Sequence, residues 1–294
     1  MKKTNLTTVT LQELCFPVEL RDETMACNKD CSKMVIGTID GVETKLNQMS
    51  DVYALIPNED IFPPIEKIFN DANIKFTVKY SHIEHARFYA DYTIEDNGLA
   101  HQMKGTNDTI KPMLRVRHSY NGKTNYSIMF GYFRLVCSNG LVIPLEEMKE
   151  FNLSLKGKHT ESIQKSLEQL KLTLDFFVLN YDKINNSITA KYETLGSRVL
   201  STPEMRIESV LKANSINIID NSKFSTLNHI MNTIRREANL SELKYKGKVN
   251  DWLVYNGINQ YLNDNDRNRM TPDVRETKDR SVFEFMLKNE PVAA

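Results

Sequence analysis

The stretch "KPMLRVRHSYNGKTNYSIMFGYFRLVCSNGLVIP", from Lys111 to Pro144, decides the fold class. Apolar and polar residues alternate on both sides of Asn121-Gly122, a dipeptide typical of the two-residue type I′ turn. This pattern predicts a hairpin with strands over 112–120 and 124–136. We therefore expect no helix between Met113 and Phe133.

A second turn signal, Ser138-Asn139-Gly140, follows the hairpin, because glycine adopts positive φ without strain. The strand pattern then resumes at Leu141. Upstream, "IKFTVKYS" (residues 74–81) alternates apolar and polar residues, with Lys75, Thr77 and Lys79 on one face. Such alternation is typical of a half-buried strand with a basic outer face. Together with "EHARFYADYTIED" (84–96), these segments predict one antiparallel sheet over 74–143.

Helical patterns flank this block. Residues 58–73 carry apolar side chains at helical spacing, and Asn58 is the expected N-cap. After Pro144 the pattern is helical, and we expect a long amphipathic helix over 160–184 capped by Thr160, then helices over 202–214, 223–240 and 248–264 and one in the last thirty residues. The fold class is therefore α+β, with an antiparallel sheet flanked by helices and a helical C-terminal half. Residues 1–155 and 156–294 are the expected units.

Composition indicates a soluble globular protein. The 294 residues are 40% hydrophobic and 26% charged, and the formal net charge is zero. No run of 18 apolar residues exists, so we expect no membrane span. The first residues, "MKKTNLTTVTLQELCF", lack the apolar core of a signal peptide, so a cytoplasmic location is expected.

Motifs for chemistry are scarce. The sequence contains no glycine-rich phosphate loop, no G-x-S-x-G and no H-E-x-x-H. Cys27 and Cys31 lack the second pair that a zinc site needs, and His82 with His85 has a spacing that suits only a turn. Cys137 is interpreted as a buried thiol, the alternative being a nucleophile with His118 or His159 as its base. We therefore expect no metal, no cofactor and no catalytic residue, although the sequence leaves the question of an enzyme open.

Charge is unevenly distributed along the chain. Residues 1–73 hold 7 basic and 12 acidic residues, whereas residues 74–134 hold 9 and 5. The basic residues of the second block alternate with aromatic residues, and a groove for single-stranded nucleic acid needs cations for phosphates and rings for bases. The candidate binding residues are Lys75, Lys79, Arg87, Arg115, Arg117, Tyr126 and Arg134, with Lys111, Lys123, Phe76, Tyr80, Phe88, Tyr89 and Tyr120 beside them.

The expected hairpin register gives these residues a geometry. Strand side chains alternate, so Arg115 and Arg117 share a face. A two-residue turn at Asn121-Gly122 places Tyr126 opposite Arg117, where its ring could stack a base beside the arginine pair. The same alternation places the Arg134 side chain on this face further along the returning strand, unless a bulge shifts it to the other face. Alternatively, the arginines pair with Glu161, Glu168 or Asp175 of the long helix and bind nothing.

The segment "RLVCSNGL", Arg134 to Leu141, resembles the signature of a family carried by phages and plasmids, the domain of unknown function 932. The similarity includes the hairpin "RVRHSYNGKTNYSIMFGYF" and extends over roughly residues 50–285, with a departure at Gly257-Ile258. The signature residues are Cys137, Ser138, Asn139, Gly140, His159, Thr160, Trp252, Asn256 and Tyr261. The resemblance implies a mobile element in a bacterial host and supplies no catalytic residue.

Two functions of different classes follow. The first is binding of nucleic acid, with single-stranded DNA annealing or recombination as its specific form; the layout of a helix, four strands and a long helix is similar to that of phage annealing recombinases, which form homo-oligomers. The second is a non-enzymatic protein that binds another protein, for example an antagonist of host defence. Zero net charge favours the second, and the basic block favours the first.

Overall fold

The computed structural model describes residues 6–22, 33–50, 53, 55–95, 101–102, 109–124, 126–134, 140–141, 179–218, 225–240, 245, 247–264, 270 and 272–291, with single residues between 165 and 175. The chain divides into two compact units. The first comprises Met1–Asn97, Met113–Phe130 and Glu146–Leu179, and the second comprises Gly98–Pro112, Gly131–Leu145 and Asn180–Ala294.

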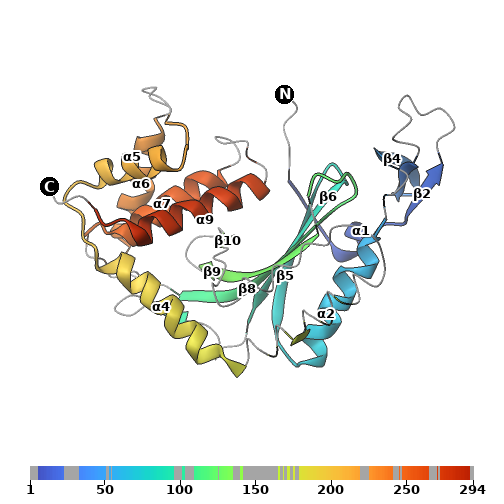
Figure 1. The fold of residues 1–294 in the computed structure, drawn as a ribbon, viewed down its shortest axis with the longest axis horizontal. Coiled ribbons are helices and arrows are strands. Elements are labelled where there is room, and N and C mark those ends of the chain that lie inside the picture. Colours follow the sequence, from blue (N-terminus) through green and yellow to red (C-terminus); the bar gives the residue numbers. More distant parts are fainter. Residues whose placement is uncertain are drawn as a thin grey trace. The chain divides into compact units, whose positions relative to one another are not determined.

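An antiparallel sheet contains the strands expected from the sequence (Figure 1). Its order is β1-β5-β6-β8-β9-β10, and β7 pairs with β8. The strands are β1 (Thr7–Val9), β5 (Phe76–Ile83), β6 (Arg87–Ile94), β7 (His101–Gln102), β8 (Thr109–Ser119), β9 (Ser127–Arg134) and β10 (Gly140–Leu141). The described residues between 113 and 133 contain no helix. Within the described residues, the predicted α+β class and the antiparallel sheet over 74–143 are therefore confirmed.

One face of this sheet is apolar and packs against α2 (Phe62–Asp71). Phe69 of α2 stacks on Tyr92 with ring centroids 5.6 Å apart, and Phe62 meets Tyr80 edge-on at 5.9 Å. The expected cap at Asn58 was wrong. Residues Asn58–Asp60 form a 3₁₀ turn (η1), and the buried Asn58 side chain donates to the Leu14 carbonyl at 2.8 Å. This tertiary contact takes the amide away from the start of the helix.

The hairpin between β8 and β9 has a wider loop than the Asn121-Gly122 dipeptide predicts. The strands end at Ser119 and begin again at Ser127, and of these two residues only Gly122 has positive φ, at 65°. The Ser119 hydroxyl donates to the Thr124 carbonyl at 2.7 Å and accepts from the Thr124 amide at 3.1 Å. The buried Tyr120 ring packs on Phe88 with centroids 4.7 Å apart. These contacts hold a longer loop, so the two-residue type I′ turn was wrong.

A separate three-stranded sheet, β2-β3-β4, precedes α2. Its strands are β2 (Val18–Asp22), β3 (Lys33–Ile39) and β4 (Val42–Met49), and α1 (Leu11–Leu14) comes before them. Asp40 and Gly41, with φ of 52° and 78°, form the turn between β3 and β4.

The described helices of the second unit are α4 (Tyr181–Ser197), α5 (Pro203–Ala213), α6 (Thr226–Ala238), α7 (Asp251–Asn263) and α9 (Pro272–Lys288). Helix α5 begins after Thr202, as expected, although the Thr202 side chain makes no capping hydrogen bond, and α7 begins after Asn250, whose side chain accepts from the Leu253 amide. Helix α4 runs thirteen residues beyond the expected end at 184, and Thr160 lies outside the described residues. Across the described part of the chain, every helix is either too short or too polar to cross a lipid bilayer.

Candidate functional site

Five basic side chains of the first unit project from one face of the sheet, opposite α2. Register pairs Lys79 with Asp91 and Asp91 with Arg115, and it pairs Tyr89 with Arg117. Directly paired residues share a face of the sheet, so these odd-numbered positions lie together. We call the set the basic face: it comprises Lys75, Lys79, Arg87, Arg115 and Arg117 with the acidic Asp91 and Glu95. The prediction that Arg115 and Arg117 share a face is confirmed.

Exposure differs strongly across the basic face. Lys75 and Lys79 are exposed, whereas Arg117 is half-buried and Arg87 retains 9% of its accessible surface. Arg115 donates from Nε and Nη2 to the two oxygens of Asp91 at 2.6 and 2.7 Å. This bidentate pair neutralises one of the predicted cations within the sheet. The accessible charge is therefore concentrated at Lys79 of β5 and at Lys75, just before that strand.

Tyr126 lies on the other face of the sheet from Arg117, so the predicted stacking position was wrong. Arg117 donates from Nε to the Ser127 hydroxyl at 3.1 Å, which shifts the expected pairing by one residue. Such a shift moves every side chain of a strand to the opposite face. Tyr126 is 4% exposed and meets the buried His118 ring edge-on, with centroids 6.3 Å apart.

The other aromatic candidates either lie on the apolar face or are buried. Phe76, Tyr80 and Phe88 contact rings on the apolar face. Tyr89 points to the basic face but is only 4% exposed. The structure therefore brings five of the predicted cations together, whereas the predicted rings lie on the other face or, in the case of Tyr89, are buried. Arg134 belongs to β9 in the second unit, and its side chain lies outside the described residues.

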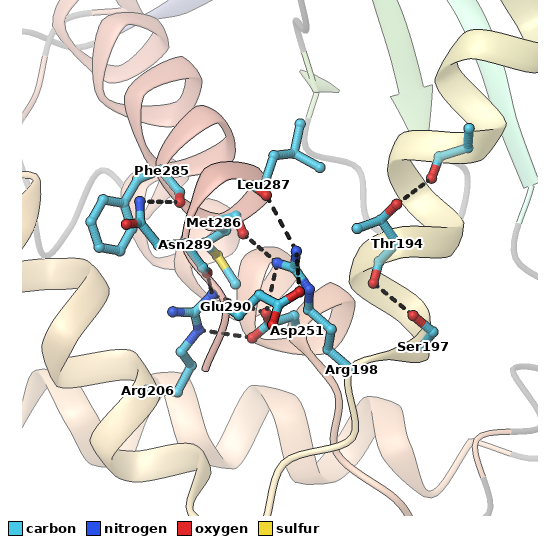
Figure 2. A network of polar contacts seen from close by, with 11 residues as sticks. Thr194, Ser197, Arg198, Arg206, Asp251, Phe285, Met286, Leu287, Asn289 and Glu290 are labelled. Atoms are coloured by element: carbon cyan, nitrogen blue, oxygen red, sulfur yellow. Dashed lines mark hydrogen bonds and ion pairs between the residues drawn. The ribbon is translucent and has the colours of Figure 1, made fainter. Parts of the chain in front are cut away.

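The second unit contains a buried ionic network that the sequence did not reveal (Figure 2). Asp251, at the start of α7, is completely buried and accepts from Nε and Nη2 of Arg206, both at 2.9 Å. Arg198 lies 3.6 Å from the same carboxylate. Arg198 also donates to the Met286 carbonyl in the last turn of α9 at 2.6 Å, and Arg206 donates to the carbonyl of Asn289, just after the helix, at 2.6 Å. Cations at a helix C-terminus stabilise it.

A cleft of about 790 Å³ adjoins this network and lies entirely within the second unit. Its lining combines the two arginines with hydroxyl groups and apolar side chains. The lining residues are Ser197, Arg198, Val199, Leu200, Ser201, Thr202, Met205, Arg206, Ser209, Phe285, Asn289, Glu290 and Pro291. Residues from α4, α5 and α9 thus meet at one cleft, although they are up to 94 positions apart in the sequence.

The family model of the domain of unknown function DUF932 matches residues 45–283, which is most of the chain. The chain belongs to the DUF932 family. No curated protein and no solved structure matches it.

Signature residues of this DUF932 protein that the structure describes are structural. Trp252 is fully buried and meets Tyr192 edge-on at 4.6 Å, and the Asn256 side chain donates to the Trp252 carbonyl of its own helix at 2.7 Å. Tyr261, 2% exposed, is within 3.2 Å of the Thr226 hydroxyl. These rings belong to the core of the second unit. Cys137, Ser138, Asn139, His159 and Thr160 lie outside the described residues, whereas Gly140 begins β10.

Metal ligation finds no support among the described residues of the DUF932 protein, where no three His, Cys, Asp or Glu side chains gather. His82 and His85 stack at 3.9 Å across a turn, and the His85 amide donates to His82 Nδ1 at 3.1 Å. Burial and the neighbouring His85 lower the pKa of His82 to about 4. Cys15 is a free, half-buried thiol whose pKa burial raises to about 11, and Cys27 and Cys31 lie outside the described residues.

Proposed function

We propose that this DUF932 protein binds nucleic acid through its phosphates, using the basic face of the first unit. The observation that supports the proposal is the charge balance of that face: five basic residues against two acidic ones, a net charge of +3 in a chain whose net charge is zero. Phosphate contacts by Lys and Arg supply most of the affinity of non-specific binding to nucleic acid.

The position of the aromatic rings defines the binding mode. Base stacking requires exposed rings beside the cations, whereas Tyr126, Tyr80 and Phe88 are at most 5% exposed. The proposal therefore assigns contacts to the sugar-phosphate backbone alone, and such contacts carry no sequence information. Annealing and recombination, a homo-oligomer and a mobile-element origin stay predictions of the sequence.

One observation favours the alternative, a surface for a protein partner. Arg115 is already neutralised by Asp91, and Arg87 is 9% exposed, so two of the five cations have little capacity for a phosphate. A flat polar face with an internal ion pair also resembles an ordinary solvated sheet. The two remaining exposed lysines, Lys75 and Lys79, therefore decide between nucleic-acid binding and binding of a protein partner, because only the first depends on their charge.

The test is charge reversal at these two lysines. Lys75→Glu with Lys79→Glu changes the charge of the basic face by four units, whereas Lys67→Glu alters an exposed lysine on α2, on the opposite side of the same sheet. Binding of fluorescent single-stranded and double-stranded DNA is measured for each protein at low and moderate salt.

The proposal expects the double variant to lose binding at least about tenfold, since two phosphate contacts are replaced by repulsion. Lys67→Glu should bind within about twofold of the parent, since its charge lies outside the contact surface. A loss of log affinity in Lys67→Glu about half as large as in the double variant, in proportion to its two-unit charge change, would reflect net charge alone and would contradict the basic face. Absence of binding by the parent protein at low salt would leave the protein-partner function in its place.

A further inference from the structure

The guanidinium of Arg206 has a hydrogen-bonding capacity that the ionic network does not use. Its Nε and Nη2 donate to Asp251 and to the Asn289 carbonyl. The other terminal nitrogen, Nη1, has no hydrogen-bond partner among the described residues. The side chain is 5% exposed and lines the cleft. A buried, fixed arginine with free donors at the wall of a cleft is a feature of anion-binding sites.

Helix α5 supplies further donors at the same place. Thr202, Met205, Arg206 and Ser209 are three or four positions apart, so they share one face of α5, and all four line the cleft. The Thr202 side chain makes no capping hydrogen bond, which leaves the first amides of the helix without a side-chain acceptor. Amides at a helix N-terminus favour an anion.

We propose that this cleft binds a phosphate ester of about nucleotide size. The lining offers three kinds of donor: the guanidinium of Arg206, the first amides of α5, and the hydroxyls of Ser201, Thr202 and Ser209. The several oxygens of a phosphate can accept from more donors than the two oxygens of a carboxylate can. The proposal is independent of the basic face, because it concerns a separate site in the other unit.

The rest of the cleft fits the organic part of such an ester. Its volume of about 790 Å³ is within the range of small-molecule sites, and Val199, Met205 and Phe285 supply apolar walls. Val199 and Met205 are 61% and 67% exposed, which is unusual for large apolar side chains and is explained by a ligand that covers them. The competing account is that both arginines serve only as caps for α9 and that the cleft stays empty.

The test uses calorimetric titration of the full chain with adenosine monophosphate, and with adenosine as the analogue that lacks the phosphate. Thr202→Asp places a negative charge at the proposed phosphate position while retaining a good N-cap residue, so the fold survives. Thr202→Asn is the neutral cap at the same position. Ser225→Asp adds the same charge at the N-cap of α6, away from the cleft. Thermal midpoints verify that each variant is folded.

The proposal expects adenosine monophosphate to bind and adenosine not to bind. Thr202→Asp should weaken binding at least about tenfold by charge repulsion at close range. Thr202→Asn, which removes the hydroxyl without adding charge, should weaken it less than Thr202→Asp does, and Ser225→Asp, outside the cleft, should change it by no more than about twofold. The proposal is overturned if adenosine monophosphate does not bind, if adenosine binds equally well, or if Thr202→Asp has no effect. The arginines would then be caps of α9 only.

The phosphate could belong to a free nucleotide or to the end of a nucleic acid strand. Titration of the Lys75→Glu/Lys79→Glu protein with 5′-phosphorylated and 5′-hydroxyl oligonucleotides distinguishes the two sources, since the basic face no longer contributes. If the 5′-phosphorylated oligonucleotide binds more tightly, the ligand is the end of a nucleic acid strand. If the two oligonucleotides bind equally, or neither binds, the ligand is the free nucleotide. The adenosine monophosphate titration tests the cleft even if the basic face does not bind DNA. The two proposals can therefore fail separately.

Discussion

Asp91 accepts both of its hydrogen bonds from Arg115 across the pairing of β6 and β8, at 2.6 and 2.7 Å. The pair is partly exposed, with side-chain exposures of 29% for Asp91 and 16% for Arg115. Salt bridges of this kind contribute little to stability, about 0.2–1 kcal/mol. In the proposed function, its main effect is to remove one cation from the basic face.

The first prediction follows from this pair. Asp91→Asn releases the Arg115 guanidinium from a charged partner and removes a negative charge, so DNA should bind several-fold more tightly. The slope of log affinity against log salt on single strands should become steeper by about 0.7, which corresponds to one further phosphate contact. Asp71→Asn, at the exposed end of α2, is the matched control. Equal gains in both variants would contradict the proposed role of Arg115.

The second prediction concerns the ionic network of the helical unit. Asp251→Ala removes the buried counter-ion of the Arg198 and Arg206 guanidinium groups. The free energy of unfolding should therefore fall by about 3–5 kcal/mol. Urea denaturation measures it. The control is Glu290→Ala. The Glu290 carboxylate lies 3.9 Å from Arg198, but its side chain is 84% exposed, so its removal should change the free energy of unfolding by at most about 0.5 kcal/mol. A loss below about 1 kcal/mol for Asp251→Ala would show that the network is not a structural anchor.

The third prediction tests the contact between α6 and α7. A Cβ at Gly257 would lie 2.7 Å from Cγ1 of Ile234, so Gly257→Ala should lower the free energy of unfolding by roughly 1–2 kcal/mol despite the better helix propensity of alanine. Gly196→Ala in α4 meets no atom within 4 Å and should raise it by up to about 1 kcal/mol. If both substitutions stabilise, α6 and α7 are not packed this closely.

The fourth prediction is a pH dependence of stability from His118. Burial among Phe88, Tyr120 and Tyr126 lowers the pKa of His118 to about 4. In the unfolded chain histidine takes up its proton near pH 6.5. Between these values the unfolded state binds more protons, so the contribution to stability is present above pH 6.5 and is lost as the pH falls to 4.

The size of this loss is roughly 3 kcal/mol for a shift of this magnitude. His118→Phe keeps a ring in the same pocket without a titrating group, so its free energy of unfolding should fall less between pH 7 and pH 4. Urea denaturation of both proteins across this range measures the difference. Parallel curves for the two proteins would show that His118 titrates normally.

Local patterns predicted the sheet and the shared face of Arg115 and Arg117, because strand alternation depends only on neighbouring residues. They did not predict the loop between β8 and β9. There Ser119 binds Thr124 and the Tyr120 hydroxyl accepts from the Asn58 amide at 2.9 Å, and these tertiary contacts set the register. The side to which Tyr126 points follows from that register.

The cleft could not be predicted from the sequence, because its residues come from segments that only the fold brings together. Arg198 and Arg206 are ordinary cations of a helical region until Asp251 and the end of α9 contact them. A weak signal was present: Thr202-Pro203 marked the start of α5, and Arg206 and Ser209 follow at helical spacing. Nothing in that pattern indicated a cleft.

The measurement that tests the central claim most directly is a salt titration of the parent protein with single-stranded DNA and with an abasic strand of equal length. Backbone contacts by two or three cations predict a straight line of log affinity against log salt with a slope of about −1.4 to −2.1. The two strands should bind equally, since the rings that could stack bases are buried. A flat salt dependence, or an abasic strand that does not bind where DNA binds, would contradict the claim.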